Sequence, residues 1–212
     1  MGRFWFSKLW IVLAAALLIL GVCLWVDLRL HPPPDVNEWF PMRVGDRWTY
    51  ADADGGEPVV FEVVAHNDVA GIPLFVVDRR CGRDKVSFAV EVTQAGVWIH
   101  GTSKGVFSPP LQEFRFPLRD GDSWTYKGRF AGRALEVTYG THSVKPTKCE
   151  VSESYSNTVA NTRFTLEKGI GVTRLAGKVN DPHQTRSGPF DWKLQKLERR
   201  RPFKRTILVP EK

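Results

Sequence analysis

Two segments of the chain carry nearly the same eleven residues. Phe40–Tyr50 reads FPMRVGDRWTY and Phe116–Tyr126 reads FPLRDGDSWTY, so eight of the eleven positions are identical at a constant offset of 76. Weaker matches follow at nearly the same offset, such as Phe61-Glu62-Val63 with Leu135-Glu136-Val137. Self-similarity at a fixed period is typical of one supersecondary unit repeated in tandem. We therefore predict a duplicated domain over residues 39–192, with repeat 1 at 39–114 and repeat 2 at 115–192.

Each motif combines turn residues with strand residues. Glycine accepts a positive φ and aspartate bonds its side chain to nearby backbone amides, so Gly-Asp predicts a turn. Trp-Thr-Tyr is strand-forming, and alternation places its two aromatic rings on one face. We interpret the aspartates as structural, with acid–base chemistry as the alternative. The residues expected to shape the turns and the core are Phe40, Gly45, Asp46, Trp48, Tyr50, Phe116, Gly121, Asp122, Trp124 and Tyr126.

Further stretches alternate in polarity or are apolar at strand length. No segment of the domain carries a 3.6-residue apolar stripe. Short links between consecutive strands indicate an all-β antiparallel meander of about ten strands, closed as a sandwich or a barrel. The predicted strands are Trp48–Ala51, Val59–Ala65, Leu74–Asp78, Val86–Thr93, Val97–His100, Ser123–Arg129, Leu135–Thr141, Thr147–Ser154, Thr162–Glu167 and Val172–Ala176, with Trp192–Leu197 as a further candidate.

The N-terminal region is apolar over the length of a membrane span. Leu9–Val26 contains no charged residue, and about 20 apolar residues cross a bilayer as a helix. We predict an uncleaved signal-anchor transmembrane helix within residues 1–30, followed by a stiff proline-rich spacer at 31–38. A cleaved signal peptide and a lipoprotein modified at Cys23 are the alternatives. Neither fits as well, because the apolar run continues past Cys23 and Val22 precedes it.

The charge distribution bears on orientation and on partners. Arg3 and Lys8 precede the span, so the positive-inside rule predicts a cytoplasmic N-terminus and an extracytoplasmic domain at the cell membrane. Residues 31–192 carry 19 Lys and Arg against 20 Asp and Glu, whereas residues 193–212 carry eight against two. The net positive charge therefore belongs to the C-terminal tail, and nucleic acid is not an expected partner. The tail residues that we expect to attract anionic lipid or envelope polymers, if the tail is not simply solvated, are Arg199, Arg200, Arg201, Lys204 and Arg205.

Both motifs, together with the Glu167–Val172 stretch EKGIGV, resemble a group of uncharacterised bacterial exported proteins and lipoproteins. In that group a yFPL..G..W.Y opening precedes β-strands, and a pGiGlV turn comes near the end. The resemblance covers most of residues 39–178. It implies an extracytoplasmic β domain and no particular activity. The chain departs from the lipoprotein members because it lacks their lipidation site.

The sequence offers few residues for chemistry. It contains no G-x-S-x-G elbow, no phosphate-binding glycine loop and no C-x-x-C pair, and we predict neither catalytic residues nor a cofactor. His66 and His142 match at the repeat offset and are weak candidates for a metal site at a pseudo-twofold axis, against two exposed strand-end histidines. Cys81 and Cys149 either form a disulfide outside the cytoplasm or remain free.

These observations favour a non-enzymatic module of the cell envelope that binds a protein, lipid or glycan, or that has a structural role. The alternative is a hydrolase that acts on envelope glycan or lipid, with recurring acidic residues or the histidine pair at its centre. Convergence of those side chains in one concave pocket would favour the hydrolase, and dispersal over the strand faces would favour binding.

Overall fold

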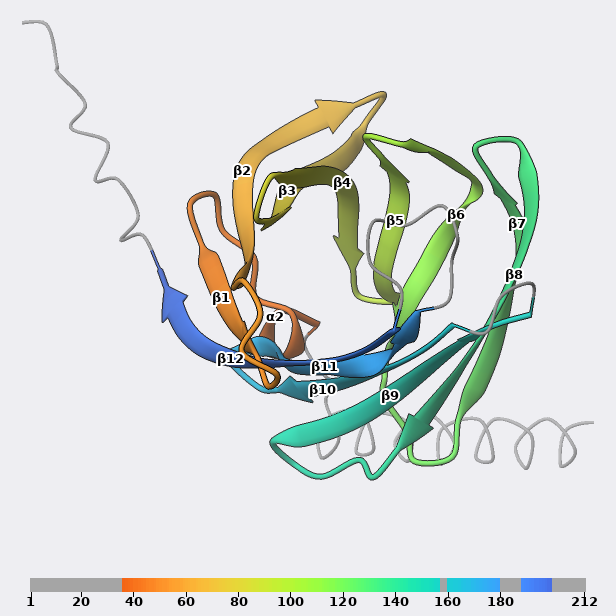
Figure 1. The fold of residues 1–212 in the computed structure, drawn as a ribbon. Helices are drawn as coiled ribbons and strands as arrows, with labels where there is room; N and C mark the ends of the chain where they lie inside the picture. Colours follow the sequence, from red (N-terminus) through yellow and green to blue (C-terminus); the bar gives the residue numbers. More distant parts are fainter. Residues whose placement is uncertain (1–35, 157–159, 180–187, 200–212) are drawn as a thin grey trace, which may run out of the picture. The chain divides into compact units, whose positions relative to one another are not determined.

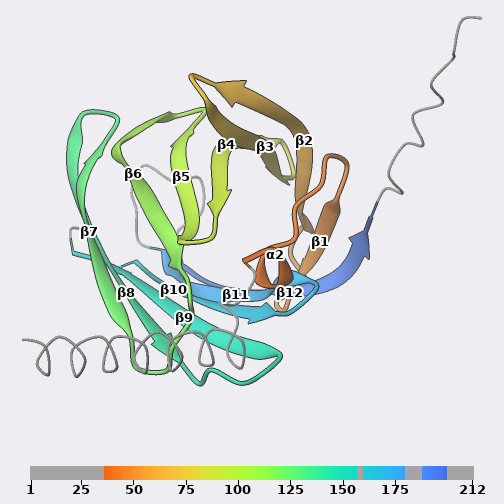
Figure 2. The ribbon, with the colours of Figure 1, turned by 180° about the vertical axis from the view of Figure 1, so that it is seen from behind.

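The structure, a computed structural model, describes residues 36–156, 160–179 and 188–199. A short helix, α2 (Val36–Trp39), is followed by twelve β-strands within these residues (Figures 1 and 2). The strands are β1 (Arg47–Asp52), β2 (Val59–Val69), β3 (Ile72–Cys81), β4 (Asp84–Thr93), β5 (Gly96–Thr102), β6 (Gly105–Arg115), β7 (Ser123–Phe130), β8 (Arg133–His142), β9 (Lys148–Tyr155), β10 (Asn161–Glu167), β11 (Gly171–Val179) and β12 (Gly188–Glu198).

The strands form one closed antiparallel barrel. Each strand pairs with its neighbours in sequence, and β12 closes the barrel by pairing with β1. The predicted all-β antiparallel meander is confirmed, and of the two closures considered the structure has the barrel. Ten or eleven strands were expected, and β6 was missed because Pro109-Pro110 interrupts its strand pattern.

The two sequence motifs form the same turn. The amides of Asp46 and Asp122 each donate to the carbonyl three residues earlier, and Gly45 and Gly121 have φ of 92° and 78°. Each glycine amide then donates to the second strand after the turn, Gly45 to Val63 O of β2 at 2.7 Å and Gly121 to Thr141 O of β8 at 3.0 Å. A positive φ at this position favours glycine, which explains why the motif keeps it.

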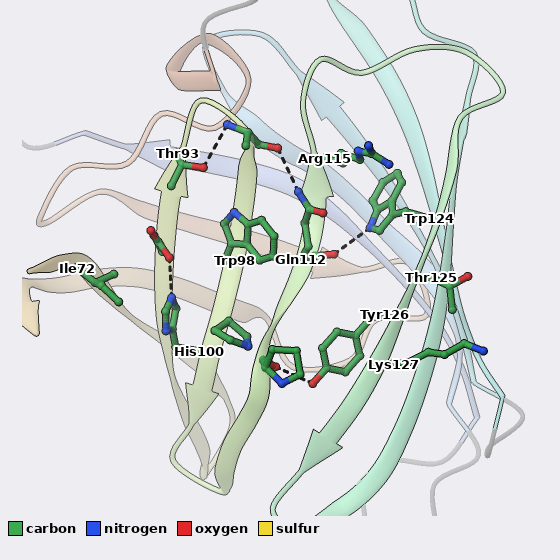
Figure 3. Close-up of a pocket in the computed structure, with 14 residues that line it drawn as sticks. Ile72, Thr93, Trp98, His100, Gln112, Arg115, Trp124, Thr125, Tyr126 and Lys127 are labelled. Carbon is green, nitrogen blue, oxygen red and sulfur yellow. Dashed lines mark hydrogen bonds and ion pairs between the residues drawn. The ribbon is translucent and has the colours of Figure 1, made fainter. Parts of the chain in front are cut away.

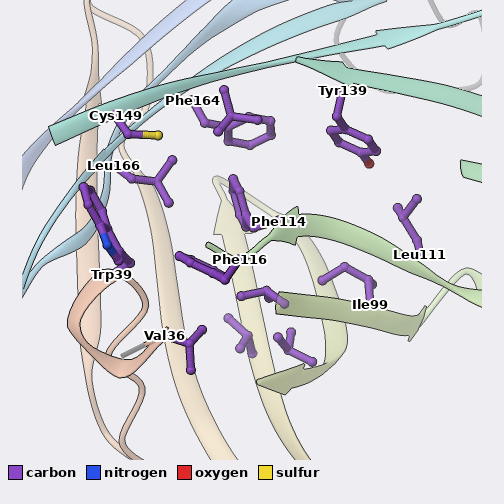
Figure 4. Close-up of a cluster of buried hydrophobic side chains, with 14 of the residues drawn as sticks. Val36, Trp39, Ile99, Leu111, Phe114, Phe116, Tyr139, Cys149, Phe164 and Leu166 are labelled. Atoms are coloured by element: carbon purple, nitrogen blue, oxygen red, sulfur yellow. The ribbon is translucent and has the colours of Figure 1, made fainter. Parts of the chain in front are cut away.

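The barrel interior is filled by side chains. Alternate residues of the strands point inward, as in Val97 and Ile99 of β5, which are 0% and 6% exposed. Aromatic rings occupy the centre, where Phe114 packs edge-on against Phe164 and Tyr139 is fully buried (Figure 4). Helix α2 adds Val36 and Trp39 to this core. These side chains belong to one hydrophobic cluster inside the barrel.

The predicted transmembrane segment at 1–30 and most of the spacer at 31–38 lie outside the described residues. Within the part of the chain that is described, no helix has the length and apolar character to cross a membrane.

Candidate ligand-binding cleft

The barrel has two strand junctions that carry the repeated motif, and they differ. At the junction of β12 with β1, six residue pairs run from Arg47–Glu198 to Asp52–Trp192. At the junction of β6 with β7, the pairs are Phe107–Phe130 and Ser108–Arg129 alone. Beyond Ser108 the strands β6 and β7 separate, so the barrel wall is open along the rest of this junction.

The sequences of β6 and β12 explain the difference. They read GVFSPPLQEFR and GPFDWKLQKLE, with glycine, phenylalanine, leucine and glutamine at the same places. Pro109 and Pro110 of β6 stand where β12 has Trp192 and Lys193, which pair with Asp52 and Ala51. Proline has no backbone N–H, so β6 cannot continue the ladder where β12 does.

Two motif side chains bridge the opening instead. Trp124 Nε1 donates to Gln112 O at 3.0 Å, and the Tyr126 hydroxyl donates to Pro109 O at 2.8 Å. Gly128 makes room for this arrangement, because a Cβ there would lie 2.2 Å from the Tyr126 hydroxyl oxygen. The side chains thus satisfy β6 carbonyls that lack a backbone partner on β7.

A cleft of about 780 Å³ follows this junction over the outer surface of β4, β5 and β6 and onto β7 (Figure 3). Its volume is within the range of small-molecule sites. Aromatic rings and prolines line it together with a few polar groups. The lining residues are Ile72, Glu91, Thr93, Ala95, Trp98, His100, Pro109, Pro110, Gln112, Arg115, Trp124, Thr125, Tyr126 and Lys127.

A β-bulge sets the side chains along β6. Trp98 pairs with Gln112 and Val97 pairs with Phe114, so Glu113 is the extra residue. Gln112 lines the cleft, whereas Phe114 is 1% exposed in the core. Without the bulge, strict alternation would turn Phe114 outward and Arg115 inward. The bulge therefore buries Phe114 and brings Arg115 to the cleft.

The charged groups of the cleft differ in whether they have partners. Glu91 Oε2 lies 2.7 Å from His100 Nε2, and Lys127 pairs with Glu136 at 3.3 Å. No hydrogen bond or ion pair from another described residue reaches the exposed Arg115 guanidinium or the Trp98 indole N–H. Gln112 donates its amide to Ala95 O at 3.2 Å, which leaves its side-chain carbonyl facing the cleft with acceptor capacity. The cleft thus offers an unpaired cation and an unpaired donor to a ligand.

Behind the cleft, the barrel interior holds two acidic residues. Glu153 Oε1 accepts hydrogen bonds from the hydroxyls of Tyr139 at 3.1 Å and Tyr155 at 2.9 Å. Burial raises the pKa of Glu113 to about 8, and the charge of Glu153 adds to that shift. Burial also raises the pKa of Glu153, although the tyrosine hydrogen bonds oppose it. Since like charges in a low dielectric cannot both ionise cheaply, Glu113 holds its proton at neutral pH.

This acidic pair is not part of the cleft surface. Neither Glu113 nor Glu153 is among the described residues that line the cleft, although Tyr139 stacks on Trp124 at 5.1 Å between ring centroids. The pair therefore lies outside the cleft lining, and Tyr139, which bonds to Glu153, connects it to Trp124 of the cleft.

The weak metal candidates are not brought together. His66 is on β2 and its ring packs at a tilt against Phe75, whereas His142 is on β8 and hydrogen-bonds to Ser152 Oγ at 2.8 Å. In the barrel order β2 and β8 lie on opposite sides, with five strands between them in either direction. Within residues 36–156, 160–179 and 188–199, no group of three or more His, Cys, Asp and Glu side chains is arranged to hold a metal.

The two cysteines are free, so the disulfide that the sequence left open is not formed. The physical reason is their place in the barrel, because Cys81 ends β3 and Cys149 begins β9, again on opposite sides. Cys149 is fully buried, and burial raises the pKa of its thiol to about 12. It behaves as an apolar core residue.

The motif aspartates have structural surroundings, and they differ. Asp46 is 0% exposed and burial raises its pKa, whereas Asp122 is exposed.

Of the basic tail, Arg199 is described and its guanidinium donates to Gly169 O. The remaining tail residues named above, Arg200, Arg201, Lys204 and Arg205, lie outside the described residues.

Sequence reasoning missed Trp98 and Arg115 of the cleft, and it missed the nearby acidic pair Glu113 and Glu153. Glu153 had a usable signal, since Cys149, Val151, Glu153 and Tyr155 alternate along β9 and place a carboxyl on an apolar face. No comparable sequence signal marks Arg115, because a bulge that shifts the alternation of side chains cannot be recognised in a single sequence.

No protein-family profile matches the chain, and no curated protein matches it. Two solved structures are similar. One, from Bacteroides fragilis, is described as exported and as having a YmcC-like fold; it is 11% identical, with a TM-score of 0.46 over 76% of this chain and 99% of its own. The other, from Parabacteroides distasonis, is described as a lipoprotein; it is 10% identical, with a TM-score of 0.41 over 76% and 99%. At such identities and scores the likeness carries no argument about function.

Proposed function

We propose that this protein is a non-enzymatic binding module of the cell envelope, which holds an envelope glycan in the cleft between β6 and β7. The observation that carries the proposal is the open junction. The β12–β1 junction pairs along six residues, whereas β6 and β7 separate after two pairs and expose a cleft of about 780 Å³ with tryptophan in its walls. Tryptophan faces and a few convergent polar groups suit a ligand that is apolar on one face and polar at its edges.

The cleft supports binding better than hydrolysis. Glycoside hydrolysis uses two carboxyl groups that flank the bond to be cleaved. Within the described residues that line the cleft, the carboxyl groups are limited to Glu91, which is engaged by His100. Neither Glu113 nor Glu153 belongs to the lining of the cleft. The geometry therefore gives no support to the hydrolase alternative.

The envelope location rests on the N-terminal sequence. A charge-free Leu9–Val26 stretch, basic residues before it and prolines after it favour a single-pass anchor with the barrel outside the cytoplasm. The module then stands close to the polymers of the envelope. The basic tail adds a second, charge-driven attraction to anionic lipid or polymer, screened by salt.

The barrel is further proposed to be a duplicated unit of six strands, β1–β6 and β7–β12. The support is the spacing of the strand starts, since Arg47 and Ser123, and also Ile72 and Lys148, differ by the motif offset of 76. In such a duplication the last strand of the second unit, β12, pairs with β1 along six residues, whereas the last strand of the first unit, β6, borders the cleft.

The binding proposal is tested with the full-length chain in mild detergent and with glycan fractions prepared from cell envelopes. Co-sedimentation or calorimetry should detect binding that Trp98→Ala abolishes and Trp98→Phe reduces only in part, because phenylalanine keeps an aromatic face without the indole N–H. Unchanged thermal unfolding of both variants is the control for folding. Equal binding by wild type and Trp98→Ala would refute the cleft as the site.

The anchor and orientation need a separate test. A C-terminal tag should stay with membranes, and protease should digest it once the envelope is opened while the inner membrane is intact. A tag that protease reaches only after the inner membrane is lysed would place the barrel in the cytoplasm and remove the envelope ligand.

A further inference from the structure

We infer that the cleft is selective for an acidic saccharide, with Trp98 packing against a sugar ring and Arg115 pairing with the carboxylate or phosphate that the sugar carries. This inference rests on the proposed function and names the class of ligand. Three features of the described residues carry it: an available indole, an unpaired guanidinium, and a carboxylate in the cleft that already has a hydrogen-bond partner.

The indole of Trp98 is available for packing. Trp98 is half-buried on the outer side of β5, while its neighbours Val97 and Ile99 point into the core. Unlike Trp124, whose Nε1 donates to Gln112 O, Trp98 has no hydrogen-bond partner among the described residues. The C–H face of a sugar ring can lie on the indole while a hydroxyl accepts its N–H. Gln112, directly opposite Trp98 in the ladder, adds a side-chain carbonyl for a second hydroxyl.

The charge of the cleft favours an acid. Arg115 pairs across the ladder with Gly96, two residues from Trp98, so its guanidinium and the indole lie on the same strip of surface (Figure 3). The bulge at Glu113 is what turns Arg115 outward, and no described residue neutralises it. A guanidinium binds a carboxylate or phosphate through two parallel hydrogen bonds, which suits a charged substituent of fixed geometry.

The opposite charge in the cleft does not cancel this preference. Glu91 lies 2.7 Å from His100, and their side chains are 21% and 20% exposed, so this carboxylate already has a partner. Lys127 is 72% exposed and likewise has a partner, Glu136. The charged group of the lining without a partner among the described residues is therefore Arg115, a cation.

Two other occupants fit less well. A peptide strand added to the open edge would need amides on β6, but Pro109 and Pro110 have none, and Trp124 and Tyr126 already donate to the carbonyls of Gln112 and Pro109. A lipid chain would need an apolar surface, whereas the cleft lining carries the Arg115 guanidinium and the Glu91–His100 pair. Both occupants are outcomes that the following test would reveal.

The test uses calorimetry on the full-length chain in detergent, with tri-galacturonate and its fully methyl-esterified form as matched acidic and neutral probes. We expect the acid to bind at least about tenfold more tightly than the ester, as expected for a charge-assisted, bidentate pair. Arg115→Gln should remove that preference by weakening acid binding until the affinities for acid and ester are alike. Arg119→Gln, an exposed arginine outside the lining, is the control and should change neither.

The outcomes separate the two levels of the proposal. Equal affinity for acid and ester, both lost in Trp98→Ala, would overturn the acidic preference and keep the glycan module. Binding of neither probe, nor of any envelope glycan fraction, would overturn both. A phosphorylated trisaccharide tested in parallel distinguishes the acids, and tighter binding of either charged sugar than of its neutral form supports the inference.

Discussion

The two junctions of this barrel begin from the same motif and end differently. At the β12–β1 junction, Trp48 and Tyr50 are buried, and backbone pairing runs the length of β1. Their side chains reach past β12 and donate to Ile170 O and Val172 O. At the β6–β7 junction, Trp124 is half-buried, and Trp124 and Tyr126 donate directly to the adjacent strand β6, where backbone pairing is missing.

The comparison teaches that the motif specifies a turn and a strand but not the closure of the wall. Closure depends on the partner strand, and β6 differs from β12 at Pro109 and Pro110. Where the partner strand has backbone amides, as β12 does, the strands pair and the aromatic side chains bond to carbonyls beyond that strand. Where it has prolines the same side chains substitute for the ladder, and the outer surface opens into a cleft.

The largest expected difference between the junctions concerns the two motif tryptophans. Trp48→Ala should lower the free energy of unfolding by about 3–5 kcal/mol, because it empties a site that is 7% exposed. Trp124→Ala should cost about 2 kcal/mol, since this ring is half-buried. Denaturant unfolding of the full-length chain in detergent measures both values. Equal losses would mean that the two junctions contribute alike to stability.

The acidic pair beneath the open junction should make stability depend on pH. With a folded pKa of about 8, Glu113 keeps a proton that the unfolded chain releases above about pH 4.3. Stability should therefore fall as pH rises from about 5 to about 8, by about 2–4 kcal/mol, and level off above that range. Unfolding curves across this range should show the fall in wild type and a flatter profile in Glu113→Gln.

A matched variant checks the assignment to Glu113. Glu136→Gln removes a carboxyl on the same half of the barrel that pairs with Lys127 near the surface. Its pH profile should follow wild type. If the free energy of unfolding of Glu113→Gln falls with pH as steeply as that of wild type, another group is responsible for the pH dependence.

Restoring an amide to β6 should begin to close the open junction. Pro110→Lys copies the residue that β12 has at this place and supplies one backbone donor toward β7. We expect slower amide hydrogen exchange in residues 124–128 and a gain of about 1 kcal/mol in stability. Ligand binding in the cleft should weaken in parallel. Unchanged exchange at residues 124–128 would show that the prolines are not what holds the strands apart.

The smallest expected effect compares the motif aspartates. Asp46 is fully buried, and neither carboxylate oxygen has a hydrogen-bond partner among the described residues. Because burial raises its pKa, Asp46→Asn should stabilise the protein by up to about 1 kcal/mol at pH 7 and have less effect near pH 3, where the aspartate is protonated. The exposed Asp122→Asn should stay within about 0.5 kcal/mol of wild type. Thermal unfolding at the two pH values tests the pair, and equal shifts would contradict the difference in burial.

Much of the fold was predictable. Alternating polarity and short Gly-containing turns located most strands, and the Gly-Asp motifs located two turns that the structure forms with the same hydrogen bonds. The strand β6 was missed because two consecutive prolines usually indicate that a segment is not a paired strand. In the structure β6 still pairs along β5, but its pairing with β7 is limited to two residue pairs. The candidate site lies at that same strand, which is why it escaped notice.

By itself the sequence determined which segments are extended, where the chain turns, and that the two motifs behave alike locally, because those properties depend on neighbouring residues and their backbone preferences. Tertiary structure decided which strands meet around the closed barrel. It placed His66 and His142, and likewise Cys81 and Cys149, on opposite sides, and it brought Trp98 and Arg115 onto one surface. These placements depend on strand order, register and a single bulge, which are set by packing between residues far apart in the chain.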